Sequence, residues 1–386
     1  MPEIDLGPTR HGPGTHALVI GASHYPFLSG PTASEFGERF GLVDLTSAAR
    51  SASDVVAWLL NEYWNPTAPL ASLRVLLSPS DGETLAEGVA ERLPASVAAS
   101  REAVERDLMA FRDACREPSN VGFVYVAGHG IQLTKRGAIV LLEDFGDPGR
   151  VELYGAIDMV GCHAGMDGTG YASNQFWFVD ACRQLPAVAR LFEELQAGVL
   201  SLPVPPGEVE CSPLYLASAS RDLAFAEIGG STLFSRALLS ALRGAAAAGP
   251  EAARALGWHV PAGRLGDVVK ETVRALASVM GEEQSVQPIG WPGRAVVHQF
   301  QSTPEVRVIL SLEPAAAAAG TTVSLLLDAD EAKTKVDQAA EWPLERTLPA
   351  GAYQIRVQTQ PPYGAVEPRL VPLMPLEYKD EIRVPS

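Results

Sequence analysis

Short apolar segments alternate along the first 300 residues with segments in which apolar side chains recur at helical spacing. Residues 122–127 (Gly-Phe-Val-Tyr-Val-Ala) are almost continuously apolar, as in a parallel strand that helices cover on both faces. Over 45–60, apolar residues recur every three or four positions, which predicts an amphipathic helix. Further strands are expected at 16–21, 73–77, 138–142, 175–179 and 214–217, and further helices at 104–115 and 232–242. This alternation predicts an α/β fold with a mostly parallel sheet wrapped by helices on both sides.

The pattern changes after about residue 300. Short strand-like runs at 305–312, 322–327, 353–357 and 381–384 are separated by Pro/Gly turns, without helical spacing among them. Such runs predict a small all-β sandwich. The expected organisation is a polar N-terminal lead (1–14), an α/β domain (15–300) and a C-terminal β-sandwich (304–386).

Composition limits the classes of partner. The formal net charge of −16 argues against nucleic acid or an anionic membrane as the main partner. No run approaches the roughly 18 apolar residues of a membrane span, and residues 1–14 lack the pattern of a secretion signal.

The four cysteines lie far apart without a Cys-x-x-Cys pair, which predicts reduced thiols in a cytoplasmic protein. No P-loop, Gly-rich dinucleotide turn or His-Glu-x-x-His motif appears, so we expect neither a cofactor nor a metal ion.

Two of the expected strands end in reactive groups. His129 stands between Gly128 and Gly130 just past the strand at 122–127, and Cys182 follows the strand at 175–179. Ligands of open α/β sheets bind at the carboxyl ends of the strands, so both side chains should reach one crevice. A neighbouring imidazole can stabilise a thiolate and later protonate the leaving amine. The backbone N–H groups of Gly130 and Cys182 are candidates for holding the oxyanion of a tetrahedral intermediate.

On these segments the chain resembles the caspase, metacaspase and paracaspase superfamily, from about residue 14 to residue 300. His129 and Cys182 lie 53 positions apart, and caspases have the histidine roughly 50 residues before the cysteine. The resemblance is carried by residues 125–130 and 180–183, and supported by 17–21, by 216–220 leading to Glu227, by the helix with Phe234 and by Gln287-Pro288. It implies a six-stranded, mainly parallel sheet with helices on both faces. It further implies a cysteine endopeptidase that acts on protein substrates through a Cys182–His129 dyad. Bacterial relatives are associated with stress, antiviral defence and regulated cell death, and the resemblance extends that expectation to this chain.

The residue two positions before the candidate nucleophile bears on specificity. Animal caspases have Gln there and cut after Asp, whereas metacaspases and paracaspases have Asp and cut after Arg or Lys. This chain has Asp180, and an acidic pocket pairs with a cationic side chain more strongly as water is excluded. Asp44 resembles a second pocket acid of paracaspases, although an acid at this place can also serve the dipole of the following helix. A third acid would be Asp222 or Glu227, and the sequence leaves that choice open.

A Pro-rich connector, 184–212, separates two halves of the α/β domain, 15–183 and 213–300. Its prolines at 203, 205 and 206 cannot continue a helix or a central strand, so this part is expected to be exposed. In caspase-like families the corresponding connector is often cut. Arg190 is therefore a candidate processing site, either for the enzyme itself or for an upstream activating protease. A passive insertion is the alternative.

Two other functions remain open on the sequence alone. One is a catalytically silent caspase-like scaffold that binds partners, although that class usually loses the Cys or the His. The other is an enzyme with the same fold and dyad but with non-basic specificity.

Overall fold

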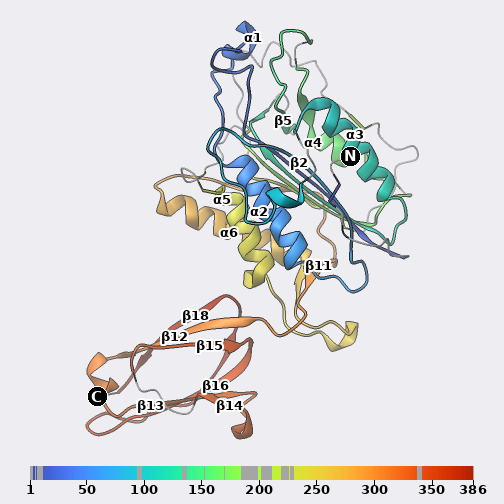
Figure 1. Cartoon of the computed structure of the whole chain (residues 1–386). Helices are drawn as coiled ribbons and strands as arrows, with labels where there is room; N and C mark the ends of the chain where they lie inside the picture. The colour runs from blue at the N-terminus through green and yellow to red at the C-terminus, as the bar shows by residue number, and fades with distance from the viewer. Residues whose placement is uncertain are drawn as a thin grey trace. The chain divides into compact units, whose positions relative to one another are not determined.

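The computed structural model of the chain describes residues 3–4, 6, 12–93, 98–132, 137–151, 153–168, 170–183, 199–200, 211–218, 226, 230–336 and 341–385. They belong to two compact units, whose elements are labelled in Figure 1. The first unit comprises Met1–Leu239 and Pro261–His298, and the second comprises Ser240–Val260 and Gln299–Ser386. Residues 240–260 therefore belong to the second unit, although their sequence placed them within the α/β domain.

A six-stranded sheet forms the centre of the first unit, with the strand order β10-β8-β7-β3-β1-β2. The strands are β1 (Thr15–Ala22), β2 (Leu70–Ser78), β3 (Val121–Gly128), β7 (Asn174–Ala181), β8 (Leu214–Leu216) and β10 (Gln287–Ile289). Neighbouring strands are parallel except for β8 and β10. The predicted fold class, a mainly parallel six-stranded sheet, is confirmed. Every residue of β3 is buried, as its continuous apolar sequence indicates.

Helices cover both faces of this sheet. Figure 1 shows α3 (Arg101–Ala114) and α4 (Met159–Ala164) on one side, and α2 (Ala48–Asn61), α5 (Leu233–Ser240) and α6 (Ala262–Val279) on the other. Ser100 begins α3 by accepting a hydrogen bond from the backbone N–H of Ala103. Gly21 of β1 lets α2 approach closely, because a Cβ there would lie 2.7 Å from the Cβ of Ala52. A short helix, α1 (Glu35–Glu38), follows β1.

A second, three-stranded sheet leaves the carboxyl end of β3. It consists of β4 (Gly130–Ile131), β5 (Ile139–Leu141) and β6 (Ala156–Asp158), in antiparallel pairs. The strand expected at 138–142 therefore exists, but it lies outside the main sheet. Its side chains join the core that α3 packs on, together with Leu108 and Phe111. Because β4 begins one residue after His129, this small sheet fixes the backbone around that residue.

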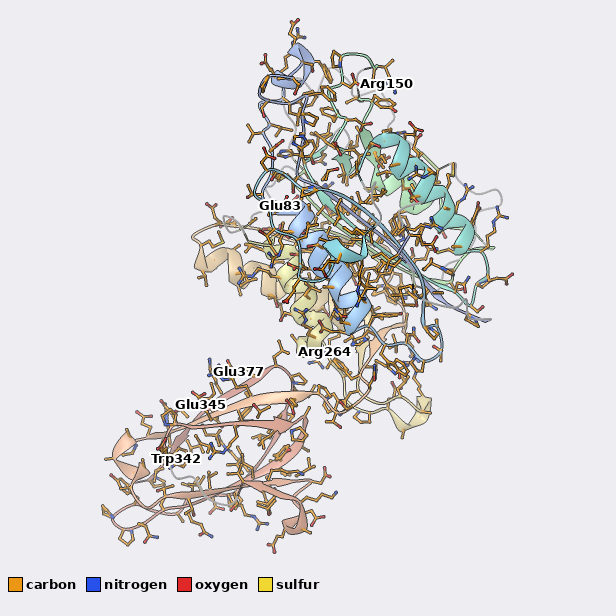
Figure 2. The ribbon with its side chains drawn as sticks, in the orientation of Figure 1. Glu83, Arg150, Arg264, Trp342, Glu345 and Glu377 are labelled. Carbon is orange, nitrogen blue, oxygen red and sulfur yellow. The ribbon has the colours of Figure 1, made fainter. Side chains whose placement is uncertain are left out.

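The second unit contains two sheets that share one core. One sheet is β12 (Glu305–Glu313), β15 (Leu344–Pro349) and β18 (Glu377–Arg383); the other is β13 (Thr322–Leu327), β14 (Thr334–Val336), β16 (Gly351–Gln358) and β17 (Arg369–Leu373). Val306, Val308 and Leu310 of β12 pack in one cluster with Leu325 and Ile355 of the other sheet. Arg307, on the alternate face, pairs with glutamates of both neighbouring strands, at positions 345 and 377, which Figure 2 labels. Two packed sheets with this alternation make an all-β sandwich.

Two short strands, β9 (His259–Pro261) and β11 (Val296–Gln299), lie where the chain passes from one unit to the other. No helix in the described part of the chain is long and apolar enough to cross a membrane.

Candidate active site

The residues predicted to react lie at the ends of two neighbouring strands. β3 and β7 pair in parallel with Ala127 opposite Asp180 and Gly128 opposite Ala181, and His129 and Cys182 are the residues that follow directly after these strand ends. Adjacent strands run about 4.8 Å apart, so this register brings the two residues side by side. Both line one cavity of about 240 Å³, whose other walls include Asp44, Asp180, Ala226 and Thr232.

His129 is held by two groups. Its Nε2 lies 2.6 Å from the carbonyl oxygen of Val43, and its backbone N–H donates to the hydroxyl of Tyr25 over 2.8 Å. A carbonyl oxygen can only accept, so Nε2 carries the proton and Nδ1 is the acceptor of the neutral imidazole. Burial lowers the pKa of His129 below its ordinary value. The side chain is therefore neutral at pH 7 and able to accept a proton at Nδ1.

Tyr25 is a supporting residue that no sequence motif marks. It is fully buried, its ring centroid lies 4.9 Å from that of His129, and its hydroxyl donates to the carbonyl oxygen of Ala22 or Leu141. Burial raises its pKa, so the phenol stays protonated. The available signal was its position three residues after the end of β1, at the same edge of the sheet as His129.

Gly130 packs directly against the backbone of Cys182. A Cβ at Gly130 would lie 2.1 Å from the carbonyl oxygen of Cys182, so no other residue fits here without moving a strand. Leu141 donates its N–H to the carbonyl oxygen of His129, which makes Gly130 a non-hydrogen-bonded position of the β4–β5 pair. The N–H of Gly130 consequently points away from β5.

Asp180 is the buried acid of the cavity. Its side chain is only 3% exposed, and its Oδ2 accepts hydrogen bonds from the hydroxyls of Tyr125, at 2.6 Å, and Thr232. Its Oδ1 has no hydrogen-bond partner among the residues that the structure describes. Burial raises the pKa of Asp180 to about 6, against the effect of the two hydroxyls, which lower it. At neutral pH the cavity is therefore lined by a carboxylate, one oxygen of which has no partner among the described residues.

Asp44 also lines the cavity, but both of its oxygens have partners. Oδ1 accepts from the backbone N–H of Tyr25 at 2.7 Å, and Oδ2 lies 2.9 Å from Nδ1 of His24. The side chain is 37% exposed. These contacts tie the segment that carries Val43 to the end of β1, so Asp44 helps to hold the carbonyl group that orients His129.

The remaining predicted residues lie outside the described part of the chain. These are the two candidates for a third pocket acid, Asp222 and Glu227, and the candidate processing site, Arg190. Of the connector 184–212, the structure describes residues 199–200 and 211–212.

The start of α2 forms one wall of the cavity, at Thr46, Ser47 and Ala48. The first backbone N–H groups of this helix are satisfied by side chains from outside it. Ala48 and Ala49 donate to Oγ of Ser23, and Arg50 donates to the carboxylate of Glu83, which Figure 2 labels. The first N–H groups of a helix have no partner within the helix. Here side chains of the protein bind them, so this wall of the cavity is held in place without a ligand.

The other three cysteines are built into the core. Cys115, Cys162 and Cys211 are buried, whereas Cys182 is partly exposed. Cys162 lies inside α4. Its burial raises the pKa of the thiol to about 12, which keeps it protonated and unreactive. Within the described residues, no group of three or more His, Cys, Asp or Glu side chains is placed to bind a metal ion.

No protein-family model matches the chain, and no curated protein matches it. Among solved structures, the chain is similar to caspase-1 from Spodoptera frugiperda, with 12% sequence identity and a TM-score of 0.41. That match covers 78% of this chain and 98% of the caspase. None of these findings assigns an activity, so the function has to be inferred from the cavity itself.

Proposed function

We propose that the chain is a caspase-like cysteine endopeptidase, with Cys182 as nucleophile, His129 as general base and Asp180 as the acid that selects Arg or Lys before the cleaved bond. The observation that carries this proposal is the in-register pairing of β3 and β7, which ends in these residues at the wall of one cavity. A partly exposed thiol, a neutral imidazole and a buried carboxylate are the groups that such a reaction needs.

The reaction follows from the protonation states of the two side chains. Nδ1 of His129 takes the thiol proton, and the thiolate of Cys182 attacks the scissile carbonyl carbon to form a C–S bond. The N–H groups of Gly130 and Cys182 hold the oxyanion. Collapse of the intermediate expels the amine, which leaves with the proton from His129. Water, deprotonated by His129, then hydrolyses the thioester and releases the acid product and the thiol.

The preference for Arg or Lys rests on charge. A buried carboxylate with an unpartnered oxygen is costly, and a guanidinium or ammonium group in the cavity would supply the missing partner. Asp44 lines the same cavity, but both of its oxygens are already paired, so among the described acids of the cavity Asp180 is the one with an oxygen left for the cation.

A panel of fluorogenic peptides that differ only in the residue before the cut tests the proposal. We expect Arg and Lys peptides to be cleaved with kcat/KM about a hundredfold above that of the neutral Arg analogue citrulline, because truncating one partner of a desolvated charge pair costs about 2–5 kcal/mol. A preference for Asp before the cut would refute the acidic pocket. Failure to cleave any peptide, together with no labelling of Cys182 by a peptide warhead, would identify a silent scaffold.

Processing within the connector belongs to the same proposal. A basic-specific enzyme can cut after Arg190 itself, and a separate protease can do so as an activator. We expect active preparations to contain molecules cut between residues 184 and 212, and latent preparations to contain intact chains. Mass spectrometry of both preparations measures this. Full activity with the segment intact in every molecule would rule out obligatory cleavage.

A further inference from the structure

Two hydroxyl groups converge on the same oxygen of the buried acid. Tyr125 and Thr232 both donate to Oδ2 of Asp180, while Oδ1 has no partner within the described part of the chain. We propose that Tyr125 and Thr232 are positioning residues for specificity: by saturating Oδ2, they orient the carboxylate so that Oδ1 binds the cation of the substrate. This inference rests on the proposed function, in which Asp180 selects Arg or Lys.

Tyr125 can act only as a donor in this arrangement. It belongs to β3, is fully buried, and lies two residues before Ala127, the residue paired with Asp180 on β7. Burial and the adjacent Asp180 carboxylate raise the pKa of Tyr125 well above its ordinary value, so its hydroxyl keeps its proton. An ionised Asp180 can only accept, so the Tyr125 hydroxyl is the donor of this bond.

The hydrogen bonds of Thr232 leave its proton for Asp180 alone. Oγ1 of Thr232 accepts from the backbone N–H of Ser235, at 3.1 Å, which caps the start of α5, and from the hydroxyl of Ser51, at 3.3 Å. A hydroxyl has two acceptor lone pairs and one proton, so the remaining bond of Thr232 is the donation to Asp180. The side chain is 8% exposed and lines the cavity.

The carboxylate is thus held from two distant parts of the chain. Tyr125 precedes the connector, whereas Thr232 follows it and is anchored on α2, where its backbone N–H donates to Oγ of Ser51 over 2.9 Å. The preceding residue, Ser231, donates to Asp54 of the same helix. The pocket therefore has its final geometry only when the second half of the domain is docked on α2.

Removing either hydroxyl should raise the pKa of Asp180, because each of these hydrogen bonds stabilises the carboxylate and lowers that pKa. Among the residues that the structure describes, the other titratable groups on the wall of the cavity are Asp44, His129 and Cys182, and the substitutions leave these three in place. A purely structural role for the two hydroxyls would instead affect the cleavage of all peptides equally.

The test compares Tyr125→Phe and Thr232→Val with the wild type on peptides that carry Arg or citrulline before the cut. We expect kcat/KM for the Arg peptide to fall about ten- to a hundredfold, because hydrogen bonds to charged groups are stronger than neutral ones. The loss should appear mainly in KM, because the cation is bound equally in the ground state and the transition state. Cleavage of the citrulline peptide should hardly change. The acidic limb of the pH profile for the Arg peptide should move to higher pH.

Two variants control for stability. Thr232→Ser keeps the hydroxyl and should restore the wild-type profile, and Ser100→Ala removes a helix cap of the same kind from α3, away from the cavity. Equal losses on both peptides without a shift of the acidic limb would overturn the proposal.

A ¹³C NMR titration of the Asp180 carboxyl group makes the test independent of catalysis, and an unchanged pKa of Asp180 in both variants would overturn the proposal as well. A wild type that cleaves without preferring Arg would instead contradict the proposed specificity, while this titration would still report on the two hydrogen bonds.

Discussion

Replacing Cys182 with alanine is expected to lower kcat/KM for Arg peptides by about three to six orders of magnitude, because the variant has no nucleophile to form the thioester. His129→Ala should lose a similar factor, since no other described residue on the wall of the cavity has an acceptor nitrogen for the thiol proton. The double variant should be about as slow as either single one, because the two side chains act as a unit. Initial rates on a fluorogenic Arg peptide measure all three.

Cys115→Ala is the matched control for this prediction. It makes the same substitution at a fully buried thiol in the core between the sheet and α3, and it should reduce stability without removing activity. Alkylation adds a second measurement: in the native protein a small electrophile should modify Cys182 alone, because the other three cysteines are buried. Near-normal turnover by Cys182→Ala would refute the assignment of the nucleophile.

Asp180→Asn is expected to remove the preference for Arg and Lys. The amide can still accept from Tyr125 and Thr232, but it would leave a bound cation buried without a countercharge, at a cost of about 3–5 kcal/mol. This corresponds to a loss of about two to four orders of magnitude in kcat/KM for Arg peptides, with little change for citrulline peptides. The ratio of the two rates is the measurement, and an unchanged ratio would show that another acid selects the cation.

The same substitution should stabilise the fold at high pH. The pKa of Asp180 is raised from 3.8 to about 6 in the folded protein, so its contribution to stability is fully present below pH 4 and is lost as the pH rises through 6. Asparagine does not titrate and escapes this loss, which amounts to at most about 3 kcal/mol. In urea unfolding, we therefore expect the stability of Asp180→Asn relative to the wild type to be greater at pH 8 than at pH 4.

Asp44→Asn is the control for that pH dependence. It makes the same chemical change on the same cavity, at a side chain that is 37% exposed to water and bonded to Tyr25 and His24. Exposed charges contribute little to stability, so its unfolding free energy should differ little from that of the wild type at either pH. A pH-independent effect of Asp180→Asn would mean that the buried acid is paired with a group outside the described residues.

Most of the sheet could be predicted from local patterns. The apolar runs at 16–21, 73–77 and 122–127 correspond to β1, β2 and β3, because a strand buried on both faces has to be apolar at nearly every position. The helix α6 was not predicted, although Leu265, Val269, Val273 and Ala277 form its buried stripe at four-residue spacing.

The sequence by itself determined which residue types stand at the strand ends: a histidine between glycines, a cysteine, and an acid two positions before it. These are local properties, fixed by the order of residues along two strands. The tertiary structure decided what those groups do, because their environment depends on residues far away in the chain. Tyr25 and His129 lie 104 positions apart in the sequence, and Asp180 and Thr232 lie 52 positions apart. These pairs meet only when the sheet register and the packing of α2 and α5 are complete. Hydrogen-bond partners, burial and the resulting pKa shifts are properties of that packing, and no local pattern encodes them.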